Sequence, residues 1–202
     1  MGFQLKPIRF SLDPDSIDYA IRQIHDLKTV LKWAVEDLIR ELTDKGVEVA
    51  NIEIASMGAV DSSVLIESIQ GWYDAGAQVG HVYTDLDYAI LVEYGTGVVG
   101  ESSPHPGIGD SDWHDPGGAS IKGETYSEYD QNKHGMGGWW YPSVNGWYIP
   151  KEGLTNEEGL PLAWTMGMPS RPFMYYTMKE LEQYAEEMGG QIIAKYIHEK
   201  GV

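Results

Sequence analysis

The stretch Tyr88-Ala-Ile-Leu-Val-Glu-Tyr-Gly-Thr-Gly97, read together with Met168-Pro-Ser-Arg-Pro-Phe-Met174, decides the fold of this chain. The first stretch is an apolar run that ends in Glu93, a glycine and a threonine. It predicts a short helix followed by a sharp turn at Gly95, because glycine accepts backbone conformations that other residues avoid. In the second stretch, two prolines hold the residues before them extended. We therefore expect the two stretches to close a loop, with Phe173 filling a core where its ends meet.

Composition sets the class of protein. The chain has 202 residues, 42% of them hydrophobic, which is enough for one domain with a real core plus an elaboration. The absence of cysteine excludes disulfide frameworks, thiolate zinc sites and cysteine nucleophiles. We expect no membrane span, since no apolar run reaches about 18 residues. The N-terminus also lacks the pattern of a secretory signal.

The charge balance is strongly acidic, with 31 Asp and Glu against 14 Lys and Arg, a net charge of −17. This balance disfavours tight DNA binding, because neutralising phosphates requires clustered basic side chains. It is compatible with DNA passing nearby, since an acidic channel would repel phosphate rather than hold it. Acidity also serves solubility alone, and that interpretation stays open.

Two long helices are predicted. Asp13-Pro14 opens the first, because Asp is a good N-cap and Pro is tolerated at the first helical position. Apolar residues at helical spacing then continue until Gly46, which we take as the stop. The second helix covers about residues 175–199, and Gly189-Gly190 predicts a kink or break within it.

Shorter elements lie between the long helices. Strands are expected over residues 47–55, 72–75 and 79–84, and short helices over 61–69 and 88–94. Asp85 or Asp87 would cap the second short helix. The predicted class is α+β: a small, mostly antiparallel sheet packed by two long helices, with a β-rich inserted arm.

Residues 97–168 form that arm, and residues 1–96 with 169–202 form the core domain. The arm holds 14 of the 24 glycines and 5 of the 7 tryptophans, and it lacks helical periodicity. Trp139-Trp-Tyr141 and Trp147-Tyr-Ile149 flank a turn with Asn145-Gly146, which is a strong hairpin signal. A structureless segment of this length is implausible in a compact domain, so we expect the arm to fold onto another surface.

These motifs, in this order, resemble the neck or tail-completion protein family of long-tailed bacteriophages. The family pattern is a helix, strands, a Tyr-Ala-x-x-x-Glu-aromatic-Gly-Thr motif, a variable segment, a Pro-Phe motif and a closing helix. The Gly-Trp-x-Tyr element at 138–141 and the lead-in at 164–169 resemble a subset from phages of Gram-positive hosts. The long insertion departs from the pattern. The matching residues are Tyr88, Ala89, Glu93, Tyr94, Gly95 and Thr96, and then Pro169, Arg171, Pro172, Phe173 and Met174.

The resemblance implies a structural role in a virion and no enzyme activity, metal or cofactor. It implies a homo-oligomeric ring, hexameric in preference to dodecameric, whose head-to-tail interface closes on itself. One face of the ring would contact the head connector or adaptor, and the other the tail terminator or tail tube protein. DNA would pass through the lumen without specific binding. The protein would reside in the virion neck after assembly in the host cytoplasm, with no membrane contact.

The residues of the two motifs are candidates for structural or subunit-interface roles. Gly95, Thr96, Pro172 and Phe173 are expected to close the loop. Glu93 and Arg171 are expected to form a salt bridge, either with each other or with a neighbouring subunit, since Arg pairs well with carboxylates.

The aromatic side chains of the arm allow two interpretations. We favour the interpretation that Trp139, Trp140 and Trp147 pack at an interface between subunits. Trp and Tyr side chains commonly anchor such interfaces. The alternative is that the arm makes the chain a carbohydrate- or receptor-binding virion module, with the same rings displayed as a platform.

The sequence gives only weak indications of a metal site or an active site. Asp110-Ser-Asp112, His114 and Asp115, with His105 and His134 in the same arm, contain metal-ligating residue types. The cluster lacks the spacing of an EF-hand loop and there is no His-Glu-x-x-His, so we interpret it as a polar loop tip. No nucleophile elbow, P-loop or dinucleotide motif is present.

Overall fold

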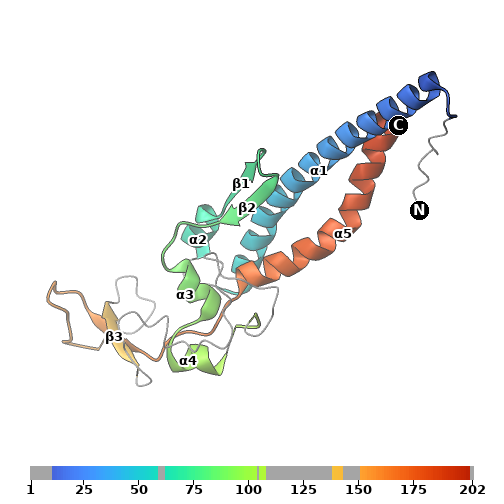
Figure 1. The fold of residues 1–202 in the computed structure, drawn as a ribbon. Coiled ribbons are helices and arrows are strands. Elements are labelled where there is room, and N and C mark those ends of the chain that lie inside the picture. Colours follow the sequence, from blue (N-terminus) through green and yellow to red (C-terminus); the bar gives the residue numbers. More distant parts are fainter. Residues whose placement is uncertain (1–10, 59–61, 104, 108–137, 143–150, 201–202) are drawn as a thin grey trace. The chain divides into compact units, whose positions relative to one another are not determined.

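The computed structural model describes residues 11–58, 62–103, 105–107, 138–142 and 151–200, and its fold is α+β as predicted (Figure 1). It divides into two compact units. The first comprises Met1–Val49, Gln70–Tyr83 and Met178–Val202, and the second Ala50–Ile69 and Thr84–Thr177. The division into a core domain and an arm, made from composition, cuts the chain differently and stays a prediction.

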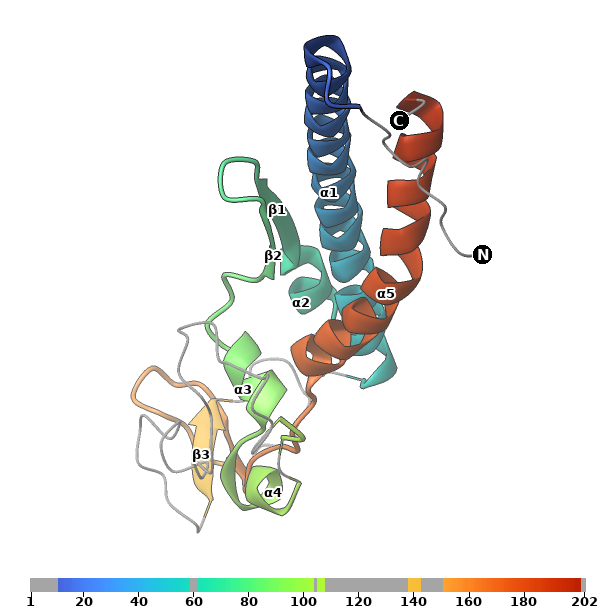
Figure 2. The same ribbon diagram turned by 45° about the vertical axis from the view of Figure 1, so that its right-hand side comes forward.

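The first unit contains α1 (Pro14–Ser56) as far as Val49 and α5 (Phe173–Lys200) from Met178, and these parts run antiparallel to each other (Figure 2). Leu38 Cδ2 lies 3.5 Å from the position of a Cβ built on Gly189, and the Lys45 ammonium lies 5.7 Å from the ring centre of Tyr184. The predicted cap of α1 is confirmed, because Asp13 Oδ1 accepts the N–H of Ser16 at 2.9 Å.

The strands β1 (Gln70–Asp74) and β2 (Val79–Tyr83) form an antiparallel hairpin that packs on α1. Gly80 allows this close packing, because a Cβ at this position would lie 2.0 Å from Thr43 Oγ1. Gly71 approaches the same helix, where a Cβ would lie 3.0 Å from Val47 Cγ2. The hairpin was predicted correctly, and its glycines set how closely it approaches the helix.

The predicted stop at Gly46 and the predicted strand over 47–55 are wrong, since α1 continues to Ser56. A Cβ on Gly46 would lie 2.7 Å from Val82 Cγ2, so this glycine makes room for the hairpin rather than ending the helix. The slipped strand pattern has a helical explanation, because the buried residues Ala50 and Ile54 are four positions apart, a spacing that a helix places on one face.

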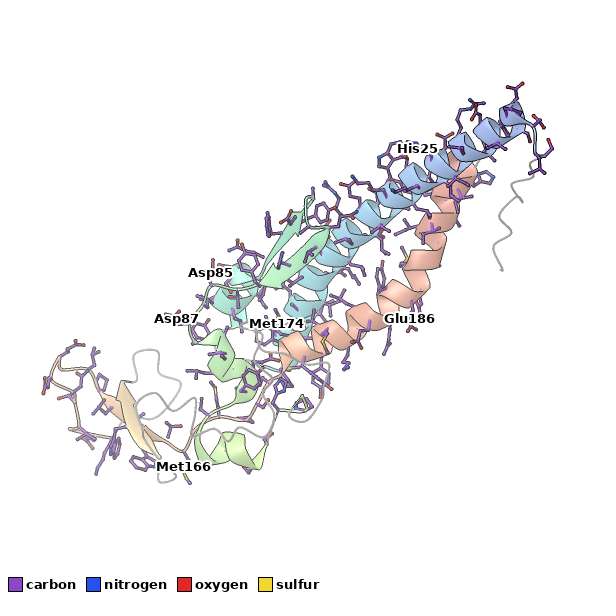
Figure 3. The ribbon with its side chains drawn as sticks, in the orientation of Figure 1. His25, Asp85, Asp87, Met166, Met174 and Glu186 are labelled. Atoms are coloured by element: carbon purple, nitrogen blue, oxygen red, sulfur yellow. The ribbon has the colours of Figure 1, made fainter. Side chains whose placement is uncertain are left out.

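The predicted weak point in α5 produces a bend and no break. The helix is continuous from Phe173 to Lys200, and it changes direction close to Glu186, a few residues before Gly189-Gly190 (Figure 3). Gly189 is buried where α5 meets α1. The pair of glycines therefore weakens the helix without interrupting its hydrogen bonds.

The second unit holds the short helices α2 (Ser62–Ser68), α3 (Ala89–Tyr94) and α4 (Gly97–Ser102), of which α4 was not predicted. It also holds the second sheet of the chain, which pairs β3 (Trp139–Pro142) with β4 (Leu162–Thr165). The predicted partner of β3, residues 147–149, lies outside the described residues. The predicted aspartate cap of α3 is wrong, because Tyr88 occupies the N-cap and no side-chain cap bond forms there.

Across the described part of the chain, no helix combines the length and apolarity that crossing a bilayer requires.

Candidate functional site

The two sequence motifs meet in the second unit, where the side chain of Glu93 caps the start of α5. Its Oε2 accepts the backbone N–H of Met174 at 2.9 Å, and its Oε1 accepts that of Tyr175 at 3.0 Å. Glu93 as a whole is only 4% exposed. Glu93 thus supplies, from 81 residues away in the chain, the acceptor that a local N-cap normally provides.

The cap is needed because α5 has no local one. Pro172 stands before the first helical residue and has no side-chain acceptor, and the first turn carries no acidic residue. The neighbouring amides are also satisfied, since Phe173 N–H donates to Arg171 O and Tyr176 N–H to Pro172 O. The positive end of the helix dipole therefore faces a carboxylate, a favourable pairing in a buried position.

His105 completes the arrangement at 2.8 Å between its Nε2 and Glu93 Oε1. Its Nδ1 accepts the N–H of Gly107 at 2.9 Å, so the ring proton belongs on Nε2, which donates to the carboxylate. The imidazole is flanked by Tyr94 at 4.5 Å and Tyr175 at 5.4 Å between ring centres. Both ring nitrogens are engaged, and the side chain is inaccessible to solvent.

In this geometry the Glu93–His105 pair forms a structural connection. The pair connects the beginning of the arm, at His105, to α5, the helix that follows the arm. His105 lies eight residues after Gly97, and α5 begins four residues after Pro169.

The two ends of the arm are also joined through the backbone. Thr96 and Met168 form an antiparallel bridge, with Thr96 N–H donating to Met168 O at 2.8 Å and Met168 N–H to Thr96 O at 3.0 Å. Gly95 has φ 75°, and a Cβ there would lie 2.5 Å from the nitrogen of Ser170. The expected requirement for glycine at this turn is confirmed.

The expected salt bridge between Glu93 and Arg171 within one chain is wrong. Glu93 is occupied by His105 and the amides of α5, and the Arg171 guanidinium instead contacts Met168 Sδ at 3.7 Å. The backbone N–H of Arg171 donates to Val92 O at 2.9 Å, which explains the position of this residue without its charge. A bond from Arg171 to a neighbouring subunit stays a prediction. The prediction for Phe173 is confirmed by its full burial.

The aromatic residues of the arm are only partly described. Trp140 and Trp164 face each other across β3 and β4 in an edge-to-face pair, with 5.1 Å between ring centres, and both are exposed. Lys151 Nζ lies 5.5 Å from the Trp140 ring centre. For Trp139 the structure describes the backbone alone, and Trp147 lies outside the described residues.

Among the residues that the structure describes, no group of three or more His, Asp or Glu side chains is placed to hold a metal ion. The cluster over 110–115 and His134 lie outside them. His105, which the sequence places in the same arm, forms a hydrogen bond with Glu93.

Sequence reasoning missed the role of His105 and the capping role of Glu93. The partners of Glu93 lie 12 and 81 residues away, and no spacing rule connects them. The one available signal was the absence of Ser, Thr, Asp or Asn immediately before Phe173, which left the helix without a local cap.

No known protein family, curated protein or solved structure matches this chain.

Proposed function

We propose that this chain is a virion structural protein that forms a ring at the neck of a long-tailed bacteriophage, joining the head connector to the tail and letting DNA pass. The observation that carries the proposal is the meeting of the two motifs of the resemblance. Glu93 of the first motif caps the helix that begins in the second. The residues of the two motifs of the resemblance are thus joined by hydrogen bonds to a buried carboxylate.

The proposed ring is hexameric, with the connector or adaptor on one face and the tail terminator or tail tube protein on the other. Its mechanism is mechanical: subunits hold one another and bridge two larger assemblies. The net charge of −17 supports a lumen that repels DNA phosphate, so DNA slides without being retained. The subunits assemble in the host cytoplasm and remain in the virion.

The alternative of a carbohydrate- or receptor-binding module is less well supported by the arm. A sugar ring stacks on a flat, open aromatic face. The rings of Trp140 and Trp164 meet edge to face, and the ammonium of Lys151 lies over the Trp140 ring. Exposed aromatic pairs of this kind suit protein interfaces, where Trp commonly dominates binding energy.

Disrupting the gene in the phage and imaging infected-cell lysates tests the proposal. We expect DNA-filled heads and separate, complete tails, and we expect the purified chain to join them when added back. Trp140→Ala and Trp164→Ala should weaken this joining while leaving the fold intact, with Tyr176→Ala, at another exposed aromatic residue, as the control. Infectious, fully joined particles from the disrupted gene would overturn the proposal, and retention of the chain on a host-wall glycan column would favour the alternative.

A further inference from the structure

The N-terminal half of α1 carries a row of exposed apolar side chains. Ile17, Ile21, Ile24, Leu31 and Val35 are all exposed, Ile21 and Ile24 by 59% and 57%. Their alternating spacing of four and three residues, with Lys28 in the remaining position, places them along one face of the helix. We call this row the α1 stripe. Contiguous exposed apolar surface on a helix marks a contact site.

Much of the α1 stripe lies beyond the reach of α5. Gly189 of α5 lies beside Leu38 of α1, and farther along α5 the Tyr196 hydroxyl bonds to Asp37, so the four described residues of α5 after Tyr196 end short of the first turns of α1. Figures 1 and 2 both show α1 continuing past this end of α5. The first turns of α1 therefore expose apolar side chains that α5 cannot cover.

We propose that the α1 stripe binds the same stripe of a second copy of this chain, with the two helices antiparallel. In the register that pairs every position, Ile17 lies opposite Val35 of the second copy, Ile21 opposite Leu31, and Ile24 opposite Lys28. Lys28 can lay its aliphatic stem over Ile24 while its ammonium reaches water. A parallel pair in register would instead bring the two Lys28 ammonium groups together in the seam.

The charges that flank the α1 stripe are compatible with a second copy of the chain as its binding partner. Between residues 15 and 35 the charged side chains balance, three acidic (Asp15, Asp18, Asp26) against three basic (Arg22, Lys28, Lys32), although the chain as a whole carries −17. This segment therefore does not repel its own copy as the rest of the chain would.

The antiparallel arrangement also places the flanking charges favourably. Asp18 and Lys32 each follow a stripe residue by one position, so they lie on the same side of the stripe. Reversing one helix brings Asp18 of each copy beside Lys32 of the other. His25 occupies the same side between them, and Figure 3 shows it pointing away from α5. The contact uses only residues 17–35 and does not depend on the proposed ring.

Cysteine cross-linking of the purified full chain tests the pairing, because the chain has no cysteine of its own. Ile21→Cys and Leu31→Cys proteins, mixed and mildly oxidised, should form a disulfide-linked dimer. Each variant alone should not, since the two Ile21 positions are ten residues, about 15 Å, apart along the axis. Asp26→Cys, on the opposite face, should not cross-link with either. Self-cross-linking of each single variant would show a parallel pair, and no cross-linking in the mixture would show no such contact; either result overturns the proposal.

A mass measurement gives an independent readout. The parent chain should elute at the mass of two 22.5 kDa copies, about 45 kDa, and Ile24→Glu should elute at 22.5 kDa with unchanged helical content. Ile52→Glu is the matched control, since Ile52 is exposed to a similar extent (55%) on the same helix but outside the stripe. A monomeric parent chain, or a loss of dimer in both variants, would contradict the proposal. Neck assembly in the phage is a separate measurement and can fail or succeed independently.

Discussion

Replacing Glu93 tests whether the distant cap holds the second unit together. In Glu93→Ala, the N–H groups of Met174 and Tyr175 and the Nε2–H of His105 lose their acceptor in a largely buried site. Each buried donor left unpaired costs about 1–3 kcal/mol. Because the three share one site their costs do not add fully, and we expect unfolding to become easier by about 4 kcal/mol.

Glu93→Gln should cost less. It keeps one carbonyl oxygen, but it turns an amide group toward a donor and removes the charge that faces the start of α5. We expect Glu93→Gln to lower the free energy of unfolding by about 2 kcal/mol. For a chain of this size 1 kcal/mol moves the melting temperature by about 2–4 °C, so Glu93→Ala should melt about 8–16 °C lower and Glu93→Gln about 4–8 °C lower.

Urea unfolding followed by circular dichroism measures the free energies, and hydrogen exchange locates the effect. The amides of Met174 and Tyr175 should exchange faster in both Glu93 variants. Glu187→Gln, an exposed glutamate on the same helix, is the control and should stay within about 0.5 kcal/mol of the parent. A Glu93→Ala protein with the parent's unfolding free energy and slow exchange at Met174 would refute the capping argument. In a double-mutant cycle with His105→Ala, we expect a coupling of about 1.5–3 kcal/mol.

Three further changes probe the first unit. Gly80→Ala should destabilise by about 1–3 kcal/mol in urea unfolding, because its Cβ would collide with Thr43 Oγ1; an unchanged midpoint would show that the hairpin can move off α1. Gly189→Ala should raise the melting temperature by about 2–4 °C, since its Cβ meets Leu38 at an ordinary 3.5 Å and alanine favours the helix by about 1 kcal/mol; a lower melting temperature would contradict this. The hydrogen bond from its hydroxyl to the Asp37 carboxylate of α1 raises the pKa of Tyr196 above its usual value near 10. Stability from that bond is present below pH 10 and is lost as the pH rises through the raised pKa, so Tyr196→Phe should lose less stability than the parent between pH 9 and 11, and equal losses would show that the bond contributes nothing.

The sequence was sufficient to predict the elements that are stabilised by residues close to them in the chain. Asp13 caps the helix that follows it, and the start of α1 was predicted from that pair of residues alone. The turn of the β1–β2 hairpin and the helix before Gly95 likewise depend on neighbours along the chain. The long helices, the antiparallel hairpin and the need for glycine at position 95 were therefore predictable.

The sequence by itself determined which segments become helices and strands at most positions, because hydrophobic spacing and capping act over a few residues. Only the tertiary structure decided that Gly46 lies inside α1 and leaves space for the β1–β2 hairpin instead of ending the helix. The same is true of Glu93, which caps α5 and forms a hydrogen bond with His105. The physical reason is that a buried donor is satisfied by whichever acceptor the closed chain brings to it. For α5 that acceptor lies 81 residues away, beyond a long insertion that no local rule spans.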